Sequence, residues 1–158
     1  MNNYWKNHYD SVSKKFDGSL LKQVGKAVNG QDIPEIQVRL IVENIANVLR
    51  LSLKDSLVDL CCGNGLITRQ LAPLVKEVVG VDYPLGLIDA AKSYDSFPNI
   101  EYANSDVSRL NPKYFLGFKK IVMYEALQHF SIEQLTQLLG DLNSLEQGSL
   151  VFLGSIPN

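Results

Sequence analysis

The stretch from residue 56 to residue 69, SLVDLCCGNGLITR, constrains what this chain can fold into more than any other part of it. A short apolar run, interrupted by Asp59, precedes the small residues CCGNG, and residues that can form a helix follow. This order predicts a buried strand, a tight loop and the N-terminus of a helix. Backbone N–H groups in such a loop point toward a ligand above it, and Gly63 and Gly65 let that ligand approach closely. The stretch therefore predicts a cradle for a small-molecule cofactor.

Length and charge limit the classes of protein that the chain can belong to. It has 158 residues, of which 46% are hydrophobic, and a formal net charge of −2. These values are typical of one globular domain and give no electrostatic case for nucleic acid or an anionic membrane as a partner. The N-terminal residues lack the apolar run of a signal peptide, and no run reaches the roughly 18 residues that span a bilayer. We therefore expect a cytoplasmic protein with no nucleic-acid or membrane partner.

The two cysteines, Cys61 and Cys62, are adjacent. A disulfide between neighbouring residues is strained, and two ligands alone do not complete a zinc site. Small cysteine side chains do suit the end of a buried strand. We expect neither a disulfide nor a bound metal here.

Aromatic side chains recur through residues 4–16 at a spacing that predicts one face of a helix. That helix either docks on the rest of the protein or forms a lid over the cofactor, and both interpretations stay open. Residues 17–30, with three glycines, are typical of a mobile loop. Asp32 then suits the N-cap of an amphipathic helix. We expect residues 1–31 to form an N-terminal aromatic helical or lid segment and residues 32–158 to form the core.

Beyond that helix, short apolar runs alternate with segments of helical periodicity. The expected strands are residues 56–61, 77–82, 99–104, 120–124 and 149–153. The expected helices are residues 65–72, residues 85–94 and a helix that begins at Ser131, which forms a capping box with Gln134. This alternation predicts an α/β fold, a doubly wound, mostly parallel sheet of about five strands with helices on both faces.

Ligands of such sheets bind beyond the carboxyl ends of the strands, at the point where the strand order reverses. Polar residues stand at these ends: Asp59, Cys61, Asp82, Asp106, Tyr124 and Glu125. Asp82 follows the glycine loop by roughly 20 residues, where an acid can accept hydrogen bonds from both ribose hydroxyls of a cofactor. A dinucleotide cofactor requires G-x-G-x-x-G, and Cys61, Gly63 and Leu66 stand at those positions. A dinucleotide is therefore disfavoured.

Several segments resemble, in order along the chain, the motifs of the Rossmann-like (class I) S-adenosylmethionine-dependent methyltransferases. VDLCCGNG (58–65) is similar to their first motif, VGVD (79–82) to the second and ANSDV (103–107) to the third. IVMYEALQHF (121–130) resembles the motif of the fourth strand, and GSLVF (148–152) the turn into the fifth. The resemblance implies a strand order of 3-2-1-4-5 and S-adenosyl-L-methionine as the cofactor, with S-adenosyl-L-homocysteine as its product.

The sequence departs from this family at two points. Cys61 stands where the family most often has a glycine. The sequence also ends after the fifth strand, whereas members of the family continue through two further strands. We expect a core that is truncated there, either as a fragment of a longer protein or with its exposed fifth-strand edge available for self-association.

The resemblance also implies roles for single residues. Asp59 is expected to face the amino group of the methionyl moiety, Asp82 the ribose hydroxyls, and Asp106 the adenine. The residues expected to bind the cofactor are Asp59, Cys61, Gly63, Asn64, Gly65, Asp82, Tyr83, Asp106, Val107 and Tyr124. The acids also have structural interpretations, because Asp82 can cap the following helix and Asp106 can start a turn.

Methyl transfer requires mainly that the donor and the acceptor are held in line and that water is excluded. An oxygen acceptor can also need a base, for which His129 is the best-placed candidate, although a packing role for this histidine is equally open. We expect an S-adenosylmethionine-dependent methyltransferase that acts on a small-molecule acceptor. The alternatives are a non-catalytic module that keeps the fold for cofactor binding or assembly and, less favoured, a dehydrogenase.

Overall fold

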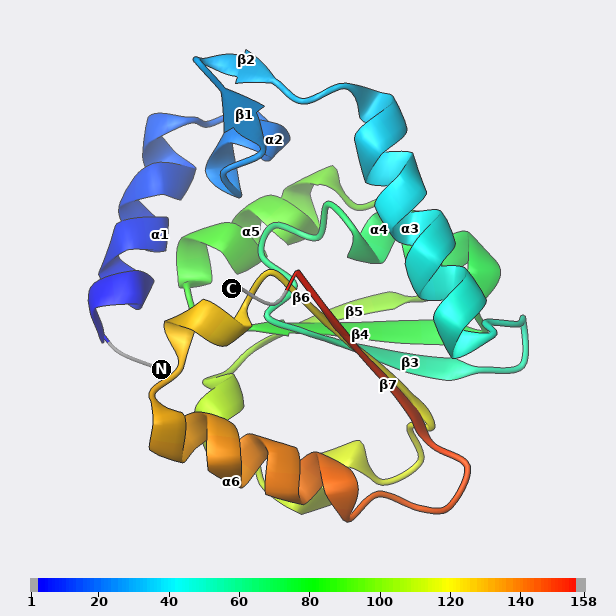
Figure 1. The fold of residues 1–158 in the computed structure, drawn as a ribbon. Helices are drawn as coiled ribbons and strands as arrows, with labels where there is room; N and C mark the ends of the chain where they lie inside the picture. The colour runs from blue at the N-terminus through cyan, green and yellow to red at the C-terminus, as the bar shows by residue number, and fades with distance from the viewer. Residues whose placement is uncertain (1–2, 156–158) are drawn as a thin grey trace.

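Five parallel strands form the centre of the structure, a computed structural model that describes residues 3–155 (Figure 1). The strands are β3 (Ser56–Leu60), β4 (Glu77–Asp82), β5 (Ile100–Asn104), β6 (Lys120–Tyr124) and β7 (Leu150–Gly154). Their order across the sheet is β5-β4-β3-β6-β7, and every neighbouring pair is parallel. Counted from β3, this is the predicted order 3-2-1-4-5. The numbering begins at three because a small N-terminal hairpin, which was not predicted, precedes the sheet.

The register brings the carboxyl ends of the strands to one edge of the sheet. In β3, the central strand, Asp59 pairs with Gly80 of β4 and with Val122 of β6. The chain moves outward from β3 through β4 to β5 and then returns to β6 on the other side, so the strand order reverses between β3 and β6. A crevice for a ligand forms beyond the carboxyl ends of the strands at such a point. The glycine loop after β3 lies at this position.

Helices cover both faces of the sheet, as predicted (Figure 1). One face carries α3 (Glu35–Leu49), α4 (Thr68–Leu71) and α5 (Leu85–Tyr94), and the other carries α6 (Ile132–Asn143). Leu57 packs with α3 in one buried cluster, whereas Val58 and Leu60 pack with α6 in another. All three side chains are completely buried. Burial of an apolar side chain of this size stabilises a fold by about 1.5–3 kcal/mol.

The N-terminal segment is folded, and the loop predicted over residues 17–30 is wrong. The segment forms α1 (Asn3–Lys15), α2 (Leu20–Gln23) and a two-stranded antiparallel hairpin of β1 (Ala27–Val28) and β2 (Gln31–Asp32). Asn29 and Gly30 join the two strands with φ angles of 51° and 78°. Positive φ at both residues is the requirement of the type I′ turn, which Asn-Gly favours.

The hairpin also corrects the predicted start of the following helix. Asp32 pairs with Ala27 in the hairpin and is therefore not an N-cap. α3 begins at Glu35, after Pro34, and ends before Arg50, whose φ of 52° is left-handed. Pro34 is the N-cap residue, one position before the first turn of the helix.

The helix after the glycine loop is shorter than predicted. α4 begins at Thr68 rather than Gly65, because Gly65 has a φ of 73° that is incompatible with a helix. A turn of 3₁₀ helix, η1 (Ala72–Leu74), continues it. The capping box of α6 is confirmed: Ser131 Oγ accepts a hydrogen bond from the Gln134 N–H, and Gln134 Oε1 accepts one from the Ser131 N–H.

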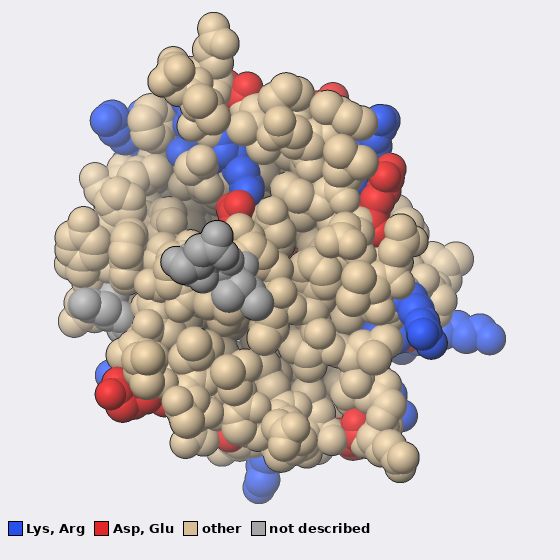
Figure 2. All heavy atoms as spheres, viewed as in Figure 1, with Lys and Arg blue, Asp and Glu red and all other residues tan. Residues whose placement is uncertain are grey.

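Short 3₁₀ turns follow β5 and β6: η2 (Val107–Arg109), η3 (Pro112–Phe115) and η4 (Leu127–His129). β7 forms the edge of the sheet and, within residues 3–155, pairs with no strand other than β6. Across the same described part of the chain, every helix is too short or too polar to cross a membrane. Figure 2 shows basic and acidic side chains scattered among uncharged ones on the face in view.

Candidate cofactor-binding site

The loop after β3 turns sharply because several of its residues have left-handed backbone conformations. Cys61 has a φ of 59°, Gly63 of 59° and Gly65 of 73°. The N–H of Cys62 donates to the carbonyl of Val81 at 3.1 Å, which ties the loop to β4. A left-handed conformation costs a non-glycine residue about 1–2 kcal/mol. Cys61 therefore preserves the shape of a glycine turn at a cost in stability.

The two glycines of the loop have different neighbours. A Cβ atom at Gly63 would lie 3.0 Å from Cγ1 of Val24 in the N-terminal segment. A Cβ atom at Gly65 would overlap the hydroxyl of Tyr102, which is buried in β5. Gly65 is thus required by packing inside the core, whereas Gly63 allows the N-terminal segment to approach the loop.

Asp82 ends β4 and is oriented by two backbone groups. Its Oδ2 accepts a hydrogen bond from the N–H of Gly63 at 2.6 Å, and its Oδ1 accepts one from the N–H of Tyr83 at 2.7 Å. The residue is only 5% exposed, and this burial raises the pKa of Asp82 to about 6 although both hydrogen bonds oppose the rise. A carboxylate oxygen has two lone pairs, so each oxygen can accept a further bond from a ligand hydroxyl.

Asp59 lies in the neighbouring strand, with its side chain on the face that carries α4. Thr68 Oγ1 donates to Asp59 Oδ2 at 2.5 Å. Burial raises the pKa of Asp59 to about 7; the bond from Thr68 opposes this rise, and the charge of Asp82 adds to it. A cationic ligand group beside two such buried acids would stabilise their charged forms. The pair therefore favours a ligand that carries positive charge.

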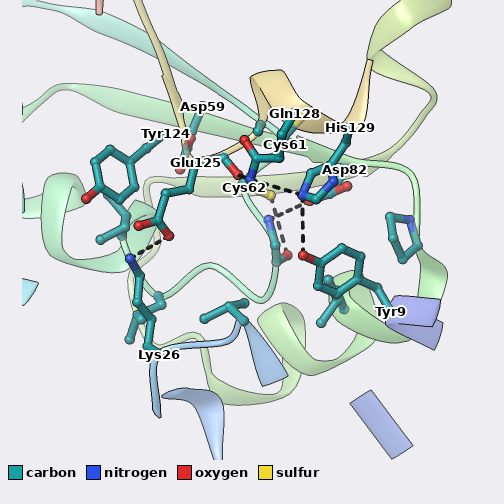
Figure 3. Close-up of a pocket in the computed structure, with 17 residues that line it drawn as sticks. Tyr9, Lys26, Asp59, Cys61, Cys62, Asp82, Tyr124, Glu125, Gln128 and His129 are labelled. Atoms are coloured by element: carbon teal, nitrogen blue, oxygen red, sulfur yellow. Dashed lines mark hydrogen bonds and ion pairs between the residues drawn. The ribbon is translucent and has the colours of Figure 1, made fainter. Parts of the chain in front are cut away.

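A cavity of about 200 Å³ lies above these residues (Figure 3). Its walls are the glycine loop, the ends of β3, β4 and β6, the start of α5, η4, and Tyr9, Val24 and Lys26 from the N-terminal segment. Figure 3 shows Lys26 toward one end of the cavity and Tyr9 with Asp82 toward the other. Small-molecule sites usually have volumes of roughly 300–1,000 Å³. A nucleoside-sized ligand therefore requires this cavity to open further.

His129, at the end of η4, closes the cavity on the side of α1. Its Nε2 lies 3.3 Å from the hydroxyl of Tyr9, and its ring centre lies 4.4 Å from that of Trp5. Burial lowers the pKa of His129, and the charge of His8 lowers it further. The ring is therefore neutral near pH 7, and its Nδ1 has no hydrogen-bond partner within the described chain. A neutral imidazole in this position can accept a proton.

Lys26 is the residue before β1, and its side chain reaches the end of the cavity opposite His129. Its Nζ lies 2.5 Å from Glu125 Oε2 and 4.9 Å from the ring centre of Tyr124. Glu125 follows β6 directly and has a left-handed φ of 54°. Lys26 and Glu125 thus form an ion pair that joins the N-terminal segment to the end of β6.

The predicted cofactor residues fall into two groups. Those that line the cavity are Asp59, Cys61, Gly63, Asp82 and Tyr124, and the candidate base His129 lines it as well. Those outside the described lining are Asn64, Gly65, Tyr83, Asp106 and Val107. A role for the second group in binding the cofactor stays a prediction.

Residues of the second group have structural partners of their own. Asn64 is completely buried, and its Nδ2 donates to the carbonyl of Leu20 and to Oε1 of Gln23, both at 2.8 Å. Val107 is buried in the core. Asp106 caps η2, because its Oδ1 accepts hydrogen bonds from the N–H and the hydroxyl of Ser108. The interpretation of Asp106 as the start of a turn is therefore confirmed.

The N-terminal segment is fastened to the core beside the cavity. Asp10 Oδ1 accepts a hydrogen bond from the N–H of Gly86 at 2.9 Å, in the first turn of α5. Ser13 lies so close to Gly86 that a Cβ atom there would overlap its hydroxyl. Figure 1 shows α1 lying along α5, and Tyr9 extends from α1 to His129. α1 therefore bridges α5 and η4.

Sequence reasoning did not identify Lys26 as a site residue. The Asn29-Gly30 pair is a signal for a hairpin and could have placed Lys26 beside an ordered strand. Nothing in the local sequence indicates that its side chain meets Glu125, because that contact joins residues far apart in the chain.

Comparison with known families and curated proteins identifies relatives of this chain. Residues 57–145 match the methyltransferase domain family. A protein of Invertebrate iridescent virus 6 whose name describes it as a methyltransferase is 31% identical over 71 residues, which are 44% of this chain and 26% of the viral protein. The 23S rRNA (uracil(1939)-C(5))-methyltransferase of Vesicomyosocius okutanii is 33% identical over 72 residues, which are 44% of this chain and 16% of that enzyme. The chain thus covers well under two thirds of either relative.

Solved structures share the fold at low sequence identity. The structure of DhpI with SAH has a TM-score of 0.69 and 15% identity, over 94% of this chain and 65% of that one. Phosphoethanolamine N-methyltransferase 1 of Haemonchus contortus has a TM-score of 0.65 and 17% identity, over 89% of this chain and 29% of that one. Both therefore share the fold of this chain.

Proposed function

This chain belongs to the methyltransferase domain family, with a class I, Rossmann-like fold, and we propose that it transfers a methyl group from S-adenosylmethionine to a small-molecule acceptor. The observation that carries this proposal is the position of Asp82. It is a buried carboxylate at the end of β4, it is held by the N–H of Gly63, and it faces the same cavity as Asp59. A role in packing alone does not require two buried acids in one cavity.

The acidic residues of the cavity fit the positive charges of S-adenosylmethionine. S-adenosylmethionine carries an ammonium and a sulfonium, and burial has raised the pKa of both Asp59 and Asp82. In the proposed complex, Asp82 holds the ribose hydroxyls and Asp59 faces the amino group. The backbone of Cys61 and Gly63, with Tyr124, contacts the methionyl moiety. When bound, the cofactor supplies a methyl group on a positively charged sulfur, which activates that carbon toward displacement.

The adenine subsite of this proposal lies beyond the described cavity. Asp106 and Val107 follow β5, next to β4 in the sheet, and therefore lie on the outer side of Asp82. Tyr83 follows Asp82 directly, while Asn64 ties the loop to the N-terminal segment and Gly65 packs against Tyr102. An adenine bound there extends the ligand beyond the volume of about 200 Å³ that is enclosed now.

We assign His129 the role of the base when the acceptor is an alcohol or another group that loses a proton. Its burial keeps the ring neutral near pH 7, as a base requires. The hydroxyl of Tyr9 lies within reach of Nε2 and orients the ring. This role adds to proximity, which is the main contribution of the protein to an in-line transfer.

The division of the chain follows from the same proposal. Residues 1–31 serve as a lid segment over the core formed by residues 32–158, and the β1–β2 hairpin connects the two. The lid interpretation is supported by Tyr9 and Lys26, which line the cavity from this side. Entry of the cofactor requires the lid to move, because the enclosed volume is smaller than a nucleoside site.

A small acceptor is favoured over a nucleic acid by charge. The net charge is −2, and basic side chains are scattered on the face that Figure 2 shows. Binding of nucleic acid usually requires a basic patch that neutralises several phosphates. The rRNA methyltransferase to which the chain is similar matches over only 16% of its length.

Calorimetric titration with S-adenosylhomocysteine tests the proposal. We expect saturable binding with one site per chain. Asp82→Asn should weaken binding at least tenfold, since a hydrogen bond to a charged group contributes about 1.5–3 kcal/mol. Asp89→Asn is the matched control, because Asp89 is exposed on α5 and does not line the cavity. It should bind as the wild type does.

Two results would contradict the proposal: absence of binding to the wild type, or equal affinity in the Asp82→Asn variant. A chain that binds the cofactor but methylates no member of a broad set of small alcohols, amines and acids would instead favour the non-catalytic alternative. Where an acceptor is found, His129→Asn should lower turnover with little change in cofactor affinity. Asn7→Ala, at an exposed position of α1 outside the cavity lining, is the control for that variant.

A further inference from the structure

Lys26 supplies the positive charge of the cavity. Among the described residues of the lining it is the sole lysine or arginine, whereas three carboxylates, those of Asp59, Asp82 and Glu125, face the same space. Its side chain is 12% exposed. A charged group so far removed from water requires partners, and Lys26 has the carboxylate of Glu125 and the ring face of Tyr124.

The backbone of Lys26 is fixed on both sides. Its N–H donates to the carbonyl of Leu21 at 2.7 Å, and its carbonyl accepts a hydrogen bond from the N–H of Ile33 at 3.0 Å. Through Lys26, these bonds join Leu21 of α2 to Ile33, the residue that follows the hairpin. The backbone that carries the ammonium is therefore held in place by hydrogen bonds and is not part of a free loop.

Among the described side chains of the lining, Lys26 alone carries a positive charge that can pair with the carboxylate of an amino-acid ligand. The methionyl moiety of the cofactor carries an ammonium and a carboxylate. The three acids of the cavity attract the ammonium and repel the carboxylate, and burial of an unpaired carboxylate is costly. Lys26 can neutralise it, because an ammonium has three N–H donors and Glu125 needs only one of them.

The direction of the ligand agrees with this pairing. Asp82 lies toward one end of the cavity and Lys26 toward the other (Figure 3). A cofactor whose ribose is at Asp82 extends its amino-acid part away from the ribose, and hence toward Lys26.

We propose that Lys26 binds the carboxylate of the cofactor's methionyl moiety and that Glu125 positions its ammonium for this contact; the inference rests on the proposed function. Since Lys26 belongs to the N-terminal segment, this contact fastens the segment to the core when the cofactor binds. The cofactor site is then shared between the segment and the core.

Two ligands that differ only in the carboxylate test this contact. S-adenosylmethionine and decarboxylated S-adenosylmethionine are titrated calorimetrically into the wild type and into Lys26→Met. We expect Lys26→Met to weaken binding of S-adenosylmethionine at least tenfold and binding of the decarboxylated ligand less than threefold. Lys14→Met, which removes an exposed charge from α1, is the matched control and should change neither affinity.

A double variant separates direct contact from a change in the charge of the cavity. Lys26→Met leaves Glu125 without its partner, and that carboxylate could then repel the ligand. In Lys26→Met/Glu125→Gln this repulsion is absent, and we expect S-adenosylmethionine binding to stay at least tenfold weaker than in the wild type. Recovery of wild-type affinity in the double variant would overturn the direct contact.

The remaining outcomes distinguish this inference from the proposed function. Binding of the decarboxylated ligand to Lys26→Met shows that the variant is folded with an intact nucleoside site. Equal weakening of both ligands overturns the carboxylate contact, as does unchanged binding of S-adenosylmethionine. If the wild type binds neither ligand, the proposed function fails and this inference fails with it.

Discussion

Residues 56–82 and residues 3–32 face each other across the cavity but build it in different ways. The first region uses its backbone: Gly63 turns the loop, and its N–H orients Asp82, which lies 19 residues away in the chain. The second region contributes side chains whose partners are distant in sequence, such as Tyr9 to His129, 120 residues apart. The cradle proposed for the cofactor is therefore a local structure, whereas the closure of the cavity depends on tertiary contacts.

The largest effect should come from the core region. Gly65→Ala adds a Cβ atom that overlaps the buried Tyr102 and strains a φ of 73°. Overpacking and strain together should cost about 3 kcal/mol or more. Gly148→Ala is the control, because its φ is 87° but nothing lies within 4 Å of the added atom, so it should cost only about 1–2 kcal/mol. Urea unfolding measures both, and equal losses would show that Tyr102 does not constrain the loop.

A second substitution breaks the connection between the two regions. Asn64→Ala leaves the carbonyl of Leu20 and Oε1 of Gln23 without their donor, and the loss of such buried bonds should cost about 2–3 kcal/mol. Asn47→Ala, at an exposed position of α3, should change stability by less than about 0.5 kcal/mol. Hydrogen exchange should also accelerate in residues 3–32 more than in β4. Uniform acceleration along the chain would argue against two separable regions.

The acids of the core region predict a pH dependence of stability. The pKa of Asp82 is about 6 in the folded protein and 3.8 as its ordinary value, so the folded state binds more protons between these pH values. Its contribution to the free energy of unfolding therefore falls as pH rises from about 4 to 7. Relative to Asp82→Asn, the wild type should lose about 1–3 kcal/mol over this range. Urea unfolding at several pH values measures this difference, and a constant difference would contradict the raised pKa.

The smallest effect should come from the contact between α1 and η4. Tyr9→Phe removes one hydrogen bond to His129, and we expect a loss of about 0.5–1.5 kcal/mol. Tyr94→Phe, at the partly exposed end of α5, is the control and should be near neutral. Thermal unfolding measures both variants. A loss of several kcal/mol for Tyr9→Phe would show that α1 is held by this contact rather than by its packing on α5.

The contrast between the regions also explains which parts of the structure the sequence could predict. Alternating strands and helices, the loop glycines and the Ser131 capping box are local patterns, and the structure confirms them. The start of α3 was predicted incorrectly. Aspartate is a residue type that often caps helices, but Asp32 pairs with Ala27 and is therefore held in the hairpin. Tertiary pairing overrode the local preference there.

The candidate site follows the same rule. Asp59 and Asp82 could be found because strand ends of a parallel sheet are predictable positions for ligand contacts. Asn64 bonds to Gln23 of the N-terminal segment, a contact that sequence reasoning did not anticipate, and its predicted contact with the cofactor stays a prediction. Lys26 could not be assigned, since its role depends on Glu125 and on a hairpin that folds over the cavity. Local sequence does not specify which side of a loop a long side chain will face.

A crystal structure of the chain with S-adenosylhomocysteine tests the central claim most directly. The account predicts that the ribose hydroxyls lie within hydrogen-bond distance of the Asp82 carboxylate, with the amino-acid part between the glycine loop and the N-terminal segment. A ligand bound away from Asp82, or one that contacts the core while residues 3–32 play no part in the site, would contradict a cofactor site built from both regions.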